Sequence, residues 1–130
     1  MQILVDTSVW IDFFPRISSR ETALFKEALQ RREQIFIAGI IAQEILQGVG
    51  NDAQHRSILR YLLLFSKIDA EFVDYLAAAN IYRSLRRRGL TIRSPVDCLI
   101  AALAIKQKAS LLHKDTDFTL IAQHFPLSVI

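Results

Sequence analysis

The chain has 130 residues, of which 52% are hydrophobic and 22% are charged, and its formal net charge at pH 7 is +3. This length predicts a single domain over residues 1–130, able to bury roughly two thirds of the surface of its unfolded chain. The longest uninterrupted apolar run, Cys98–Ile105, is far shorter than the roughly 20 residues that cross a bilayer, so no membrane segment is expected.

The composition also indicates where the protein works. The first residues lack the basic start and long apolar stretch of a signal peptide, and the single cysteine, Cys98, permits no internal disulfide. Both features predict a cytoplasmic protein. The high apolar content predicts an apolar surface that meets a partner.

In the first half of the chain, apolar runs alternate with amphipathic segments. The pattern predicts a strand over residues 2–5, a short helix over 8–14 ended by Pro15, a helix to about residue 32 capped by Ser18 or Ser19, a strand over 34–37, and a helix over 40–47 ended by Gly48 and Gly50.

The second half continues the alternation. It predicts a helix over residues 52–65, a brief strand at 67–68, a long helix capped by Asp69 and ended at Gly89, a helix starting at Ser94-Pro95-Val96-Asp97, a strand over 110–113, a short helix over 118–123 and a last strand over 127–130. The helix that follows Asp97 is apolar on every side and should be central to the core.

Alternating strands and helices predict an α/β fold of three layers, α/β/α, with a short parallel sheet of four to five strands and helices on both faces. In such sheets, ligands bind beyond the carboxyl ends of the strands. Asp6 and Asp115 follow strands and fall at that edge, and the starts of the helices that carry Glu44 and Asp97 point to it. Burying a lone carboxylate costs several kcal/mol unless it is paired or bound to a metal, so a shared cation site is predicted.

Each acid also has a structural explanation. Asp6, Asp97 and Asp115 can each cap a helix, as can Asp117, and Glu44 can be an exposed position of an amphipathic helix. Oxygen ligands alone favour a hard cation such as Mg²⁺ or Mn²⁺. Thr7 and Ser8 either cap a helix or hydrogen-bond a ligating carboxylate.

Further side chains have two interpretations. Arg83, Arg86, Arg87, Arg88 and Arg93 lie in a stretch without acids, and this group either binds RNA phosphates or complements a helix end. Cys98 is interpreted as a core thiol rather than a nucleophile, and Trp10, Phe13 and Phe14 as core or interface residues rather than stacking platforms for bases.

Four motifs carry a family resemblance. Asp6–Asp12 resembles the opening DTS-x-W-I-D motif of PIN-domain ribonucleases, especially VapC-type toxins, and Gln43–Gly48 resembles their second acidic motif. Pro95–Ala101 is similar to their D-x-x-I-A helix, and His113–Phe118 to their closing D-x-D-F motif. The resemblance covers the chain from end to end with the motifs in order. His113-Lys114 departs from it, because many relatives have a threonine and a variable residue there.

The resemblance implies a PIN-like fold and a Mg²⁺-dependent or Mn²⁺-dependent endoribonuclease, the toxin of a type II toxin–antitoxin pair, leaving a 5′-phosphate and a 3′-hydroxyl. It implies that Asp6, Glu44, Asp97 and Asp115 are the catalytic metal ligands. Asp117 is an additional candidate, and Asp115 is favoured as nearer the strand end. The implied partners are an RNA substrate, a cognate antitoxin that inserts a segment into the acidic groove, and a second copy of the chain.

Two other functions compete with this one. A phosphoacceptor receiver module has a similar sheet and acidic pocket, and needs paired acids after the first strand and an acceptor Asp after the third. Here Asp6 stands alone, Asp69 is available as the acceptor, and Glu44 would have no role. A haloacid-dehalogenase-like phosphatase needs a second Asp where Ser8 stands.

Overall fold

The computed structural model describes all of residues 1–130 and alternates strands with helices almost as the sequence predicts. The strands are β1 (Gln2–Val5), β2 (Gln34–Ala38), β3 (Ser66–Ile68) and β4 (Ser110–Leu112). The helices are α1 (Thr7–Phe13), α2 (Arg20–Gln30), α3 (Gly39–Gln47), α4 (Asp52–Leu62), α5 (Phe72–Arg87), α6 (Pro95–Gln107) and α7 (Thr116–Ala122).

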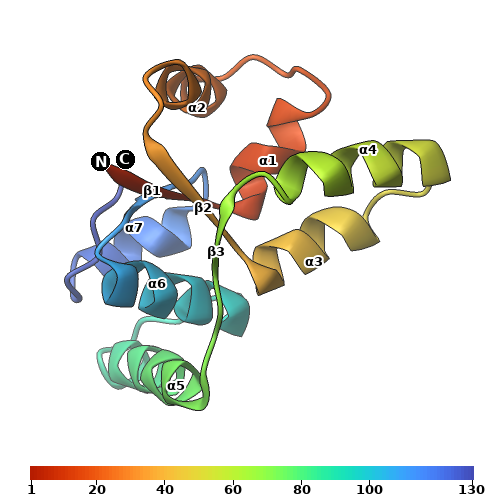
Figure 1. The fold of residues 1–130 in the computed structure, drawn as a ribbon. Helices are drawn as coiled ribbons and strands as arrows, with labels where there is room; N and C mark the ends of the chain where they lie inside the picture. Colours follow the sequence, from red (N-terminus) through yellow and green to blue (C-terminus); the bar gives the residue numbers. More distant parts are fainter.

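The four strands form one parallel sheet in the order β3-β2-β1-β4. The helices α5, α6 and α7 lie on one side of the sheet, and α1 and α2 lie on the other (Figure 1). The helix α3 extends from the end of β2, and α4 runs back from it to β3. The predicted three-layer α/β/α fold is therefore confirmed. Since all strands are parallel, their carboxyl ends share one edge, where α1, α3 and α7 begin.

The predicted last strand over residues 127–130 is reduced to a single parallel bridge between Leu111 and Val129. Leu111 donates to Ser128 O at 2.8 Å and accepts from Ile130 N at 2.9 Å. The two hydrogen bonds of Leu111 thus hold residues 128–130 beside β4 without forming a strand ladder.

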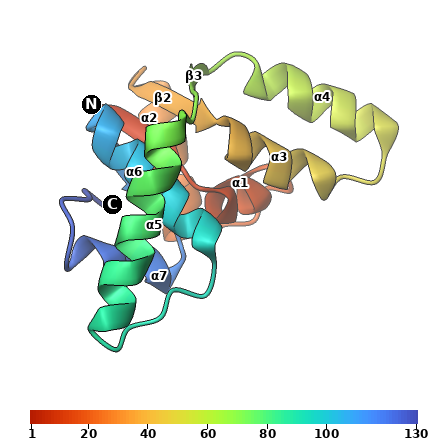
Figure 2. The ribbon, with the colours of Figure 1, turned by 90° about the horizontal axis from the view of Figure 1, so that it is seen from below.

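The helix α6 is the centre of the core, as its uniformly apolar sequence predicts. Every residue from Asp97 to Ala104 is buried. The helix packs against α5, α7 and β4 (Figure 2). Its position matters for function, because its first turn carries Asp97 to the sheet edge. No helix of the structure is long and apolar enough to cross a membrane.

The predicted aromatic core residue Trp10 is completely buried in α1. Its indole Nε1 donates to Val5 O at 3.1 Å, and its ring meets Phe25 edge-on with centroids 4.7 Å apart. Phe13 and Phe14 pack against the same ring. These contacts fix α1, and therefore the residues between β1 and α1, against the sheet.

The start of α5 differs from the prediction. The helix is capped by Glu71, and the Asp74 carboxylate accepts the backbone N–H of Glu71 at 2.8 Å, whereas Asp69 is exposed and accepts no hydrogen bond. The same Asp74 oxygen accepts Lys106 Nζ of α6 at 3.0 Å. The buried Asp74 thus caps α5 through a local hydrogen bond and ties the helix to α6 through Lys106. At the other end, Gly89 has the positive φ of +77° that favours glycine.

Candidate metal centre

The site forms where β1 and β4 end side by side. Asp6 N donates to Leu112 O at 2.9 Å, which holds the two chain segments together immediately beyond the sheet. The carboxylate of Asp6 follows β1, and the turn after β4 leads to Asp115 at the start of α7. The first turn of α6 adds Asp97, so three of the predicted acids converge at one edge.

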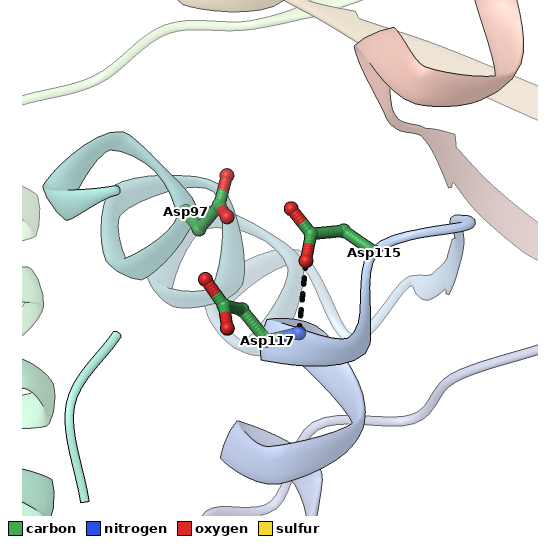
Figure 3. Close-up of side chains that lie close together, drawn as sticks. All are labelled: Asp97, Asp115 and Asp117. Carbon is green, nitrogen blue, oxygen red and sulfur yellow. Dashed lines mark hydrogen bonds between the residues drawn. The ribbon is translucent and has the colours of Figure 1, made fainter. Parts of the chain in front are cut away.

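Three carboxylates are near enough to share one cation. Asp97, Asp115 and Asp117 each present an oxygen, and the three oxygens lie within 4.8 Å of one another (Figure 3). Asp97 belongs to the first turn of α6, Asp115 caps α7, and Asp117 lies in the first turn of α7. The sequence did not decide between Asp115 and Asp117 as the ligand, and the structure places both in this cluster.

Helix capping explains part of this arrangement but not Asp97. Asp115 Oδ1 accepts Asp117 N at 2.9 Å as a cap, while its second oxygen points toward Asp97 in Figure 3. The Ser94 side chain makes no capping hydrogen bond at the start of α6, and no capping box joins Ser94 to Asp97, so helix capping does not account for this acid. Asp97 Oδ2 is buried and has no hydrogen-bond partner in the protein. The fold therefore buries this carboxylate oxygen without giving it a hydrogen-bond donor.

Asp6 lies at the margin of this cluster. It is buried, and its Oδ2 accepts Ser8 N at 3.0 Å and Ser8 Oγ at 2.6 Å. Ser8 Oγ in turn accepts Lys114 N at 3.1 Å. Burial raises the pKa of Asp6, although its hydrogen bonds to Ser8 oppose the rise. Asp6 thus both caps α1 and stands beside the other acids, with one oxygen committed to Ser8.

Glu44 is further from the three clustered acids. It is half-buried on α3, and its Oε1 accepts Thr7 Oγ1 at 2.8 Å. The structure does not bring Glu44 within the distance that joins Asp97, Asp115 and Asp117. The two hydroxyls that the sequence marked, those of Thr7 and Ser8, each donate to a carboxylate of the predicted site.

The electrostatics of the site centre on Asp97. Burial, followed by the charges of Asp115 and Asp6, raises the pKa of Asp97 to about 8. Without a cation, the cluster therefore holds a proton at neutral pH to relieve repulsion among its acids. An all-oxygen donor set with one unpartnered buried oxygen fits a hard divalent cation, which would replace that proton.

Sequence reasoning missed the position of Arg93. Its guanidinium Nη2 lies 3.4 Å from Asp115 Oδ1, its Nε lies 3.8 Å from Asp117 Oδ2, and its backbone N–H donates to Asp117 Oδ2 at 3.1 Å. From the sequence, Arg93 was interpreted together with the arginines of α5, because no acid lies near it in the chain. Asp117 is 24 residues away, and only the fold brings it to Arg93. Arg86, Arg87 and Arg88 remain exposed at the end of α5 and pair with no carboxylate.

Burial keeps two neighbouring groups uncharged. Burial raises the pKa of Cys98 to about 11, with Asp97 adding to the rise, so the thiol stays protonated. This supports its interpretation as a core thiol. His113 is buried edge-on to Phe118, its Nδ1 has no partner, and burial lowers its pKa, which keeps the imidazole neutral.

The receiver-type pocket is absent. In the sheet, β1 lies between β2 and β4, whereas Asp69 follows the edge strand β3. Asp69 is exposed there and does not join the acidic cluster. The phosphoacceptor geometry would need this residue near Asp6.

A groove adjoins the site. The helices α1, α3 and α4 border an open cavity of about 620 Å³. Its apolar lining includes Ile11, Phe14, Ile45, Val49 and Ile58. Glu44 belongs to this lining and accepts the hydroxyl of Thr7, the residue that follows Asp6, so it links the groove to the end of β1.

Comparison with known proteins identifies relatives over nearly the whole chain. Residues 3–123 match the PIN domain family. The chain is 39% identical over 123 residues to VapC ribonuclease Mb1587 of Mycobacterium bovis, covering 93% of this chain and 92% of the relative. It is 32% identical over 116 residues to Ribonuclease VapC1 of Methanocaldococcus jannaschii, covering 88% of this chain and 76% of the relative.

Solved structures share the fold. VapBC2 from Rickettsia felis, bound to a DNA fragment from its promoter, superposes with a TM-score of 0.79 at 22% identity, covering 100% of this chain and 98% of the other. A toxin–antitoxin complex from Klebsiella pneumoniae superposes with a TM-score of 0.68 at 26% identity, covering 98% of this chain and 95% of the other.

Proposed function

Because the chain belongs to the PIN-domain family, where its relatives are VapC ribonucleases, we propose that it is a metal-dependent endoribonuclease and the toxin of a type II toxin–antitoxin pair. The observation that carries the metal-dependent activity is the unpartnered buried oxygen of Asp97 facing two further carboxylates. A cluster without a cation has to keep a proton on Asp97, as its raised pKa indicates, whereas a bound cation would satisfy the buried oxygen directly.

Asp97, Asp115 and Asp117 are the proposed ligands of Mg²⁺, with Mn²⁺ as a substitute. When bound, the cation lowers the pKa of a coordinated water and offsets the charge of the attacked phosphate. Ser8 holds the Asp6 carboxylate beside the ligands, so Asp6 is placed to complete the site. In this proposal, Asp97 releases its proton when the cation binds.

Glu44 is assigned to proton transfer rather than to direct ligation. The Thr7 hydroxyl holds Oε1 of Glu44, which leaves Oε2 without a hydrogen bond. Oε2 is the proposed acceptor of the proton from the attacking water. Attack at phosphorus breaks the bond to the 3′-oxygen, which takes up a proton from solvent, and gives the 5′-phosphate and 3′-hydroxyl that the family resemblance implies.

The proposed RNA contacts lie on the exposed arginines at the end of α5. Arg86, Arg87 and Arg88 have no carboxylate partner, so their charge is available to backbone phosphates. Arg93 belongs to a different part of the molecule, the edge of the acidic cluster.

The proposed antitoxin site is the groove between α1, α3 and α4. Its apolar lining suits the apolar side of an inserted segment, and Glu44 at its end suits a basic side chain of that segment. A segment seated there covers the approach to the acidic edge and shuts off cleavage. A cytoplasmic location, where messenger and transfer RNA are available, completes the proposal.

The experiment that tests the function is cleavage of a single-stranded RNA labelled at its 5′ end. The purified protein should cleave it with Mg²⁺ or Mn²⁺, release fragments that carry a 5′-phosphate, and stop when EDTA is added. Cleavage that continues in EDTA after dialysis would contradict metal dependence. Complex formation with a cognate antitoxin should suppress the activity, and full activity in that complex would contradict the toxin role.

A further inference from the structure

Arg93 lies in the connection between α5 and α6 and contacts two of the three clustered acids. Its guanidinium approaches Asp115 Oδ1 at 3.4 Å and Asp117 Oδ2 at 3.8 Å. Its backbone N–H donates to Asp117 Oδ2 at 3.1 Å. A positive charge of the protein itself therefore stands at the rim of the proposed cation site.

The side chain and the backbone of Arg93 are held with different strength. Charge-assisted hydrogen bonds between nitrogen and carboxylate typically measure about 2.7–2.9 Å, so the two guanidinium contacts are long. The Arg93 side chain is 75% exposed, and ion pairs at such exposure hold weakly. Asp117, by contrast, is 9% exposed, and it anchors the Arg93 backbone. The guanidinium can swing away while the connection stays in place.

Arg93 also leaves the inner oxygens of the cluster free. It engages Asp115 Oδ1, which already accepts Asp117 N, and Asp117 Oδ2. Neither contact involves Asp97, whose Oδ2 remains without a partner. The guanidinium thus neutralises the rim of the cluster without satisfying its buried centre.

We propose that Arg93 is a resident counter-ion of the cluster that competes with the metal cation in the free protein and turns to an RNA phosphate once the cation is bound. The inference rests on the proposed nuclease function and adds a regulator to that site. A bound cation takes over the charge of Asp115 and Asp117, which weakens their hold on the guanidinium. The planar fork of Arg93 then faces the same edge as the substrate and suits two oxygens of a phosphate.

The test compares Arg93→Gln with Arg31→Gln. Arg31 is a matched control, because it is an exposed arginine paired with one carboxylate, Glu27, on the distant helix α2. Calorimetric titration of RNA-free protein with Mn²⁺ should show that Arg93→Gln tightens the dissociation constant by about three- to tenfold, the size expected for releasing one or two exposed ion pairs. Arg31→Gln should leave it unchanged.

The second measurement is KM for a single-stranded RNA at saturating Mn²⁺. Arg93→Gln should raise KM about tenfold and lower the slope of log KM against log salt by about one, the loss expected for one phosphate contact. Arg93→Lys keeps the charge but not the planar guanidinium, so its KM should lie between those of wild type and Arg93→Gln.

Unchanged or weaker Mn²⁺ binding by Arg93→Gln would overturn the proposed competition with the cation, and an unchanged KM would overturn the proposed phosphate contact. If no variant cleaves RNA, the nuclease proposal fails, while the Mn²⁺ titration still decides whether Arg93 competes with the cation.

Discussion

The protonation of Asp97 governs how the site behaves at the scale of single residues. Its pKa is raised to about 8 by burial first and by Asp115 and Asp6 next, so removal of its proton is costly without a cation. In the unfolded chain the same carboxyl has its ordinary pKa of 3.8 and is ionised above about pH 5. Between these values, the folded state binds more protons than the unfolded state.

The metal-free protein should therefore lose stability as the pH rises from about 6.5 to about 8. The stability that the proton on Asp97 contributes is fully present below the pKa of 3.8 in the unfolded chain. It is lost as the pH rises through the pKa of about 8 in the folded protein, with a slope of at most about 1.4 kcal/mol per pH unit. The range begins at pH 6.5 so that His113 does not contribute. Because burial lowers the pKa of His113, this residue reduces stability only below about pH 6.5, where the imidazole takes up a proton in the unfolded chain. Urea unfolding in EDTA measures the slope, and Asp97→Asn should reduce it. Equal slopes for both proteins would contradict the raised pKa.

At the scale of elements, one carboxylate joins α5 to α6. Asp74 accepts the backbone N–H of Glu71 and the Nζ of Lys106, and these contacts, the backbone bond foremost, lower its pKa. Asp74→Ala should lower the free energy of unfolding by about 1–3 kcal/mol, because it removes a helix cap and leaves Lys106 unpaired. Asp69→Ala is the control, since Asp69 lies just before the helix but accepts no hydrogen bond. Urea denaturation that shows equal losses for both variants would refute this role of Asp74.

The end of α5 carries the exposed arginines. Replacing Arg86, Arg87 and Arg88 together with Gln should weaken RNA binding and lower the salt slope of log Kd by up to about two to three, if each contacts a phosphate. Mn²⁺ binding should not change, because none of the three touches the acidic cluster. Fluorescence anisotropy with labelled RNA measures the slope. A triple variant with an unaltered slope would mean that these residues serve only to complement the helix end, with a stability loss of about 0.3–1 kcal/mol each.

Local patterns predicted most elements because they depend on neighbours in the chain. The strand β1 and the helix α6 follow from short apolar runs, and Ser19 caps α2 as expected. The place of Arg93 was not predictable, because it depends on Asp117, which is 24 residues away in the sequence. The start of α5 rests on a local bond between Glu71 N and Asp74, whose spacing the sequence contains, whereas the tie from Asp74 to Lys106 appears only in the fold. The convergence of Asp6, Asp97 and Asp115 was predictable, since all strands of a parallel sheet end at one edge. Which acids lie nearest each other depended on the packing of α7 against α6.

At the scale of the whole molecule, one surface is unusually apolar. Around the end of α4 and the start of α5, Leu64 is 76% exposed, Phe72 77%, Val73 61% and Leu76 52%, and the edge strand β3 lies between them. A solvent-exposed strand edge beside such side chains is unfavourable in an isolated molecule. A second copy of the chain, as the family resemblance implies, would cover both.

We propose that two copies of the chain pair through this surface, so Leu76→Asp should yield a monomer where the wild-type protein is a dimer. A charge on this surface must be desolvated twice in a symmetric interface, so one substitution acts at two places. Light scattering after size-exclusion chromatography measures the mass. Ile17→Asp is the control, because Ile17 is 50% exposed before α2 and lies outside this surface. A wild-type protein that is monomeric at high micromolar concentration would contradict this role of the surface.

The most direct test of the account replaces Asp97 and follows cation binding and RNA cleavage in the same preparation. Asp97→Asn keeps the size of the side chain and removes a ligand charge, while Asp52→Asn changes an exposed acid in the first turn of another helix, α4. Asp97→Asn should remain folded, bind Mn²⁺ more than about tenfold more weakly and lose more than about 99% of the cleavage rate, whereas Asp52→Asn should match wild type. A folded Asp97→Asn variant that cleaves RNA at the wild-type rate in Mg²⁺ would contradict the account.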